Sequence, residues 1–401
     1  MRNFILLITL FLSPTFSPAL QAQALHPVNA TLAANGIAAA QAELAGKSDA
    51  ESLFLQGGLA FLRGAERSMQ TRWTYGATMR GTDFPVLRLP VAPNPEALEF
   101  EAALIGRIFA DMGEDMALAR GFLAQIPQGA DFGASINITD IWFDVNADGQ
   151  RQPGESMANI ASAALDRRMN EEQAAVIVRF DYADARWLSA YTHLLSGVSE
   201  MVAAFDPTAA INQIIDARES FAALGTNPMN MGAMMIGGDF DSWLDYFTMV
   251  YQALRQQPDP AHTRAAHGHF LAMIAENRAF WAALAAESDN EAEWIPNKNQ
   301  ISALGLVLPE DVGQAWQAVL FDLEAMLLGD KLVPFWRLGP DAGINIRDMF
   351  MNPPPVDIVG FVQGFALLPY MERGPLIDAA SWRAFDRMVQ GDGLMFAAFL
   401  N

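Results

Sequence analysis

The chain has 401 residues, no cysteine and a formal charge of −21. Such an acidic surface repels nucleic acid and anionic lipid, which excludes both as partners. Without cysteine there are no disulfides and no lipidated N-terminal cysteine, so stability must come from core burial, with help from a metal. The length is sufficient to bury a sizeable core.

The first 24 residues have the pattern of a secretory signal peptide. Arg2 gives a positive start, Phe4–Leu12 are apolar, and Ala22-Gln23-Ala24 forms a small-x-small cleavage site. The apolar segment is too short to span a bilayer. We therefore expect cleavage near Ala24 and a periplasmic or secreted chain that starts at about Leu25. This mature chain carries 24 basic and 46 acidic residues, and it lacks the run of roughly 18 apolar residues that a membrane span needs.

Hydrophobic periodicity predicts helices through most of the chain. A helix over about 29–45 and a second over about 49–72 should form a hairpin. Four prolines within 83–95 predict an extended connector. Asn94 as a cap and Pro95 at the first helical position then predict the start of a long helix.

Two short segments interrupt the helical pattern. Ile136 and Ile138 alternate within 135–143, and 175–180 contains a β-branched run, so we expect a two-stranded ribbon. Further helices are predicted over about 182–204, 207–224, 240–256, 260–286 and 309–328. The predicted fold class is therefore mainly α, a multi-helix globular domain with a short two-stranded β-ribbon. Residues 25–401 are expected to form one domain, with two closely packed lobes as the alternative.

Residues 144–155, between the two predicted strands, read Asp-Val-Asn-Ala-Asp-Gly-Gln-Arg-Gln-Pro-Gly-Glu. This segment resembles the EF-hand loop, which takes side-chain oxygens from positions 1, 3 and 5, a backbone carbonyl from 7, water at 9 and a bidentate Glu at 12. The resemblance implies a calcium ligand set of Asp144, Asn146, Asp148, Gln150 through its carbonyl, Gln152 through water, and Glu155. Hard oxygen donors in this number suit Ca²⁺.

The resemblance covers the loop and not a helix–loop–helix unit. Arg151 stands where the family has an apolar β-branched residue that pairs with a second loop, and the sequence contains no second loop. Pro153-Gly154 delays an exiting helix, and 136–143 is extended where the family has its entering helix. Unpaired loops of this kind resemble structural calcium sites of exported bacterial proteins. The alternative is an Asx-type turn that binds no ion.

Other candidate residues favour structural roles. On a helix, His262 and His269 share a face but lie about 10 Å apart along the axis, and His267 points elsewhere, so no zinc site is expected. His193 is interpreted as a packed or capping histidine. The methionines of 229–235 could bind a soft metal, but filling gaps in the core is the preferred interpretation.

Two functions remain open. The first is an exported calcium-binding protein whose Ca²⁺ braces the fold, with a carbohydrate or an envelope protein as its partner. The second is a periplasmic polysaccharide-active enzyme of the helical-toroid type, which needs two carboxylates facing each other across a cleft. The available carboxylates are Asp181, Asp184, Glu200, Asp289, Glu291 and Glu293. Asp181 and Asp184 are also explained as helix caps.

Overall fold

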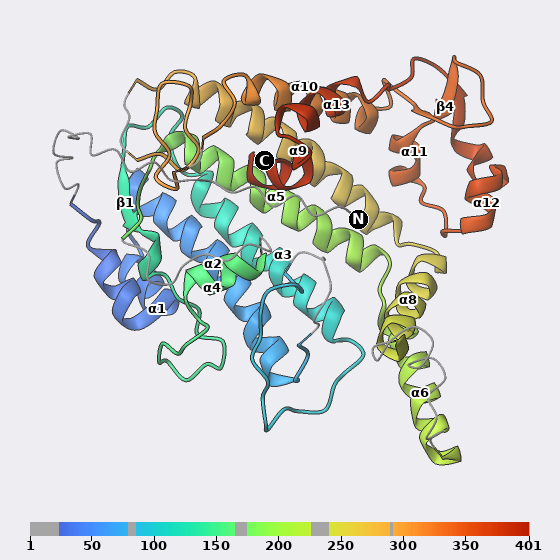
Figure 1. Cartoon of the computed structure of the whole chain (residues 1–401), viewed down its shortest axis with the longest axis horizontal. Coiled ribbons are helices and arrows are strands. Elements are labelled where there is room, and N and C mark those ends of the chain that lie inside the picture. The colour runs from blue at the N-terminus through green and yellow to red at the C-terminus, as the bar shows by residue number, and fades with distance from the viewer. Residues whose placement is uncertain are drawn as a thin grey trace.

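The computed structural model describes residues 24–78, 86–164, 175–225, 240–288, 292–305 and 307–400. A layer of long helices forms its centre, and each packs against the next in chain order (Figure 1). These helices are α2 (Ala50–Thr74), α3 (Leu104–Leu123), α5 (Tyr182–Ala204) and α9 (Pro260–Leu284). The mainly helical fold class is confirmed.

The N-terminal hairpin consists of α1 (Val28–Leu44) and α2. Asp49 caps α2 by accepting a hydrogen bond from the Ser52 backbone N–H at 2.9 Å. Within α1, Gly36 breaks the helical geometry with a φ of 79°. A Cβ at this position would lie 3.1 Å from the Trp142 ring, so the glycine permits both the kink and the close packing of the indole.

The prediction that Asn94 and Pro95 start a helix is wrong, because α3 begins at Leu104. The Asn94 side chain accepts a hydrogen bond from the Glu96 N–H, which forms one turn only. Its amide nitrogen donates to the Trp73 carbonyl of α2, at 3.1 Å. This segment is therefore held along the end of α2, and the helix starts only after it.

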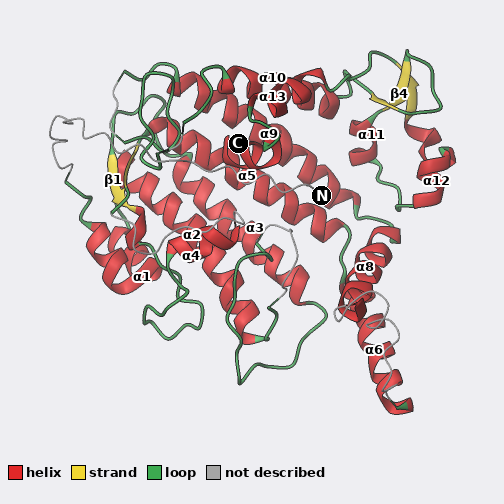
Figure 2. Ribbon diagram, in the orientation of Figure 1, coloured by secondary structure: helices red, strands yellow, loops and turns green. Residues whose placement is uncertain are grey.

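The two-stranded ribbon is confirmed. β1 (Ala134–Asn137) pairs antiparallel with β2 (Ile177–Phe180), and Ile136 lies opposite Val178. β1 is shorter than predicted because a 3₁₀ turn, η1 (Ile138–Asp140), ends it. A second, unpredicted sheet lies at the opposite end of the molecule (Figure 2). It consists of β3 (Val333–Pro334), β4 (Ala342–Ile344) and β5 (Met371–Arg373).

The remaining elements cover or extend the central layer. They are α4 (Met157–Ala164), α6 (Thr208–Leu224), α8 (Phe240–Arg255), α10 (Val312–Leu328), α11 (Ile346–Met351), α12 (Ile358–Gln363), η2 (Phe365–Tyr370), α13 (Ala380–Met388) and α14 (Gly393–Leu400). α10 packs on α9 and α13, whereas α6 and α8 pack on each other and project from the layer (Figure 1). In the described part of the chain, no helix combines the length and apolar character needed to cross a membrane.

Apolar side chains form separate clusters along the layer. One lies between α1, α2 and the ribbon and includes Phe143 and Val145, on either side of the first predicted ligand. Another surrounds α9, α10 and α13 and includes Trp316 and Phe385. The predicted calcium loop thus starts from a chain segment that is fixed in the core.

Candidate metal centre

A β-bridge, instead of a helix pair, closes the ends of loop 144–155. Trp142 pairs antiparallel with Ser156. The Phe143 N–H donates to the Glu155 carbonyl at 2.8 Å, which aligns the first and last residues of the loop. After the bridge the chain enters α4. The extended entry and the delayed exiting helix agree with the departures from the EF-hand pattern.

Within the loop, carboxylates accept hydrogen bonds from backbone N–H groups. The Asp144 carboxylate accepts from Asp148 and Gly149, both at 3.0 Å, and Asp148 accepts from Gln150 at 2.8 Å. The N–H of Gln150 is the main cause of a lowered Asp148 pKa. Positive φ values at Ala147 (58°) and Gly149 (71°) let the chain turn around the Asp144 carboxylate.

Glu155, at the last position, folds back over the beginning of the loop. Its two carboxylate oxygens accept from the N–H groups of Val145 and Gln152, at 2.9 and 2.8 Å. The side chain is buried, and burial raises its pKa, with a further contribution from Asp144 and Asp148. Three carboxylates therefore lie close enough to repel one another.

The other predicted ligands join this group to different extents. The side-chain amides of Asn146 and Gln152 both donate to Asp148, at 3.0 and 2.6 Å. Gln150 donates its backbone N–H to the Asp148 carboxylate. Arg151 points toward the Thr139 carbonyl, 3.5 Å away, outside the loop. Hydrogen bonds thus link the side chains that the pattern singled out, but Asp144, Asp148 and Glu155 do not bring one carboxylate oxygen each within 4.8 Å of one another. Their roles as calcium ligands stay a prediction.

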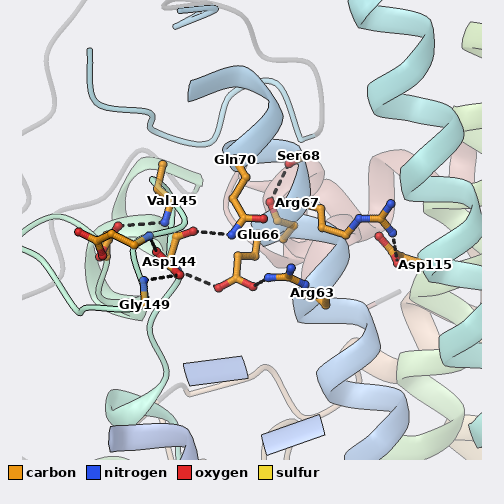
Figure 3. A network of polar contacts seen from close by, with 12 residues as sticks. Arg63, Glu66, Arg67, Ser68, Gln70, Asp115, Asp144, Val145 and Gly149 are labelled. Atoms are coloured by element: carbon orange, nitrogen blue, oxygen red, sulfur yellow. Dashed lines mark hydrogen bonds and ion pairs between the residues drawn. The ribbon is translucent and has the colours of Figure 1, made fainter. Parts of the chain in front are cut away.

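The start of the loop is attached to α2 (Figure 3). The Asp144 N–H donates to the Glu66 carboxylate at 2.8 Å, and the Gln70 side chain donates to the Asp144 carbonyl at 2.7 Å. Glu66 is almost fully buried, which raises its pKa against the opposing effect of the Asp144 N–H. The first predicted ligand is therefore positioned by two side chains of a core helix.

Charged side chains extend this attachment of the loop from α2 to α3 (Figure 3). Glu66 pairs with Arg63 one turn earlier on the same helix. Arg67, on the neighbouring position of α2, forms an ion pair with Asp115 of α3 at 2.8 Å. The loop is thus connected to a charged network between two central helices. No feature of the sequence pairs Glu66 with Asp144, which is 78 residues away.

A second acidic group joins three chain segments. One carboxylate oxygen from each of Asp181, Glu287 and Glu293 lies within 4.8 Å of the others. The sequence singled out Asp181 and Glu293 separately and missed Glu287. Asp181 caps α5, since its carboxylate accepts from the Ala183 N–H at 2.9 Å, and Arg179 lies 3.8 Å from it.

Asp184 lies beside this acidic group. It completes the capping box of α5 by accepting from the Asp181 N–H at 3.1 Å, as predicted. Burial raises the Asp184 pKa well above its usual value, and the negative charges of Asp181, Glu293 and Glu287 raise it further. The group can share protons or hold a cation, and its burial favours protonated carboxyls.

The histidines form pairs between α5 and α9. His193 and His269 approach to 2.9 Å between their Nδ1 atoms, and His262 lies 2.6 Å from a Glu200 oxygen. Burial lowers the His193 pKa to about 4. His267 instead donates to a backbone carbonyl of α10 at 2.8 Å. The three histidines of α9 therefore have three different partners, and Glu200 is not part of the acidic group.

Several predictions fall on residues outside the described ranges. These are the signal peptide up to residue 23, the methionines of 229–235, and Asp289 and Glu291. Comparison with known proteins finds no family model that matches the chain and no similar curated protein or solved structure. The roles of its residues therefore follow from their own geometry and chemistry.

Proposed function

We propose that this chain is an exported calcium-binding protein in which one Ca²⁺ in loop 144–155 braces the fold. The return of Glu155 over the loop carries the proposal, because it places a buried carboxylate beside those of Asp144 and Asp148. A divalent cation among them would remove their mutual repulsion, and carboxylate and amide oxygens are the donors that Ca²⁺ prefers. The signal-peptide pattern supports export.

The attachment of the loop favours a structural role for this ion. Asp144 is held by Glu66 and Gln70 of α2, and the bridge beside Glu155 leads into α4. An ion bound to both ends of the loop would therefore fasten the ribbon and α4 to the central layer. Arg151 points toward the Thr139 carbonyl, away from the ligand group, and the sequence contains no second loop with which it could pair.

The polysaccharide-active enzyme stays a prediction, which the arrangement of carboxylates does not favour. Asp181 and Glu293 do come together, but both are buried. Glu287 lines a cavity at the end of α9, whereas its two partners do not. This acidic group therefore does not supply two carboxylates facing each other across a cleft, as glycoside hydrolysis requires.

Calcium should raise the thermal stability of the mature protein. For a Kd on the order of 10⁻⁴ to 10⁻³ M, a tenfold excess of Ca²⁺ adds about 1.4 kcal/mol to the free energy of unfolding. In a chain of this size that amounts to an increase of a few degrees in Tm. The measurement compares melting curves in excess chelator and in millimolar calcium.

Asp148→Asn is the most informative variant, because the side chain is exposed and the amide oxygen can still accept from Gln150. This variant should lose most of the increase in Tm that calcium causes, and its Tm without calcium should not change. Asp131→Asn, at an exposed position before β1, is the matched control and should keep the full increment. If the wild type melts at the same temperature in both conditions and calorimetry detects no binding, the loop is an ordinary turn.

A further inference from the structure

Helices α6 and α8 pack on each other and form an arm that projects from the central layer (Figure 1). Of the side chains that the structure describes in this α6–α8 arm, only Ala210, Ile211 and Ala253 are buried. All three lie in the turns that join the arm to the layer. Helices of 16 or 17 residues are marginal in water by themselves. The outer part of the arm therefore has no core of its own, and a partner surface would stabilise it.

The side of α8 that faces away from α6 is apolar. Four large side chains on this side are 43–59 % exposed: Trp243, Leu244, Tyr246 and Phe247. At roughly 100° per residue, they fall within a sector about 160° wide. Asp245 lies on the opposite side of the helix, where it pairs with Arg218 of α6. The apolar face of α8 is therefore open to a partner.

Aromatic rings form a continuous ridge along this face. The Trp243 and Phe247 rings are 5.7 Å apart between centroids with an interplanar angle of 11°, and those of Phe247 and Tyr251 are 6.1 Å apart with an angle of 5°. The Arg255 guanidinium lies over the Tyr251 ring, 5.4 Å from its centroid. These residues are four positions apart, and rows with this spacing are the ridges through which two helices most often pack together.

The exposed apolar area of the arm is as large as one half of a dimer interface. A fully exposed aromatic side chain has about 150–250 Å² of surface. Four aromatic residues that are 43–66 % exposed therefore leave roughly 400–500 Å² open: Phe221 of α6 with Trp243, Tyr246 and Phe247. With Leu224 and Leu244 the arm exposes roughly 650 Å², more than the roughly 300–600 Å² of the largest apolar patch on a typical monomer. Two such surfaces would bury roughly 1,300 Å², within the range of about 1,200–2,000 Å² for standard interfaces.

The charges of the arm favour a second copy of the chain over a membrane surface. Four acidic residues stand against two arginines in α6 and α8, which repels anionic lipid. The first six residues of α8 include two aspartates, whereas its last residue, Arg255, is exposed and forms no ion pair among the described residues. A two-fold axis near Phe247 would place the basic end of each α8 beside the acidic start of the other.

We propose that the α6–α8 arm is a dimerisation surface, through which two copies of this chain pair with their α8 helices antiparallel. No residue of loop 144–155 belongs to the arm, so this pairing is independent of the proposed calcium site. Sedimentation equilibrium of the full mature chain, from about 1 to about 100 µM, should show twice the mass of one chain at the higher concentrations, with a Kd on the order of 10⁻⁶ M. The result should be the same in chelator and in millimolar calcium. A wild type that stays monomeric, or that binds phosphatidylcholine vesicles as a monomer, would overturn the proposal.

Phe247→Glu places two like charges opposite each other at the two-fold axis. The dimer should weaken by about a hundredfold or more, while the circular dichroism spectrum of the dilute chain is unchanged because the side chain is exposed. Leu118→Glu on α3 is the matched control, since Leu118 and Phe247 are both 50 % exposed, and it should dimerise like the wild type. Undiminished dimerisation of Phe247→Glu would place the interface elsewhere.

Single cysteines test the antiparallel arrangement, because the chain has no cysteine of its own. Phe247→Cys should form a disulfide-linked dimer on mild oxidation. Trp243→Cys should not, because its two copies would lie about 12 Å apart along the helix pair, beyond the reach of a disulfide. Equal cross-linking of both variants would show parallel helices, and a dimer in which Phe247→Cys does not cross-link would show that α8 is not at the axis. Either result would overturn the proposed pairing.

Discussion

Two groups of aspartate and glutamate side chains in this molecule differ in their surroundings. In loop 144–155, Asp148 is exposed and accepts hydrogen bonds from backbone and amide N–H groups, and its pKa is lowered. In the acidic group at the start of α5, Asp184 is buried beside Asp181, and its pKa is raised well above the usual value.

This difference shows that the surroundings of a carboxylate, and not only the number of its acidic neighbours, set the direction of its pKa shift. In the loop, the Gln150 N–H lowers the pKa of Asp148 and so favours its charged form, which is the form that binds Ca²⁺, whereas burial raises the pKa of Glu155. At the start of α5, burial and the negative charges of Asp181, Glu293 and Glu287 favour the protonated form of Asp184.

The largest effect is expected at Glu66, which attaches the loop to α2. Glu66→Ala leaves the Asp144 N–H and the Arg63 guanidinium without their partner. We expect a loss of about 3 kcal/mol in the free energy of unfolding, because one side of a buried charge pair is removed. Urea unfolding in chelator measures this loss.

The same variant should also reduce the calcium increment, since Asp144 is no longer held in position. Glu114→Ala, at an exposed position of α3, is the control and should change stability by no more than about 0.5 kcal/mol. A Glu66→Ala protein with wild-type stability would mean that the loop does not depend on α2.

A smaller effect is expected for Asp184→Asn in the acidic group. The folded-state pKa of Asp184 lies above its unfolded value of about 3.9, so its contribution to stability is fully present below that pH. It is lost as the pH rises through the folded-state pKa. Asparagine does not titrate, so the stability of the variant relative to the wild type should increase as the pH rises from 4 to 8.

Unfolding of both proteins by urea at several pH values tests this prediction. Asp131→Asn provides the same substitution at an exposed site and should show no pH-dependent difference from the wild type. If the stability difference between Asp184→Asn and the wild type is constant or shrinks with rising pH, Asp184 is ionised in the folded protein and the contrast with the loop disappears.

Much of the helical framework could be predicted because its signals are local. The helix predicted over 182–204 agrees with α5 residue for residue, and Asp181 caps it. The helix predicted to start at Pro95 failed because Asn94 bonds to Trp73 of α2, a tertiary contact that overrides a good capping pattern. The second sheet was missed because its strands are only two or three residues long.

The same limit applies to the sites. Loop 144–155 could be predicted because its donors stand at fixed spacing in one segment. Glu66, which supports it, could not, since only folding brings α2 to the loop. Glu287 was missed for the same reason, although Asp181 and Glu293 had been considered as carboxylates. The close packing of Trp281 of α9 against Gly313 of α10 is likewise a tertiary contact that no sequence pattern indicates.

The smallest expected effect is on the stability that calcium adds, and it shows which of the two acidic groups binds Ca²⁺. Glu155→Gln in the loop and Glu287→Gln in the acidic group each replace one carboxylate by an amide of equal size. If Ca²⁺ binds in the loop, Glu155→Gln should lose most of the increment of about 1.4 kcal/mol, because a bidentate charged ligand becomes a weak neutral one. Glu287→Gln should change it by less than about 0.3 kcal/mol.

Melting curves with and without millimolar calcium, together with the stoichiometry from calorimetry, distinguish the outcomes. A calcium increment that survives Glu155→Gln and vanishes in Glu287→Gln would move the ion to the buried group at the start of α5, and the backbone N–H groups of the loop would then serve only to shape a turn.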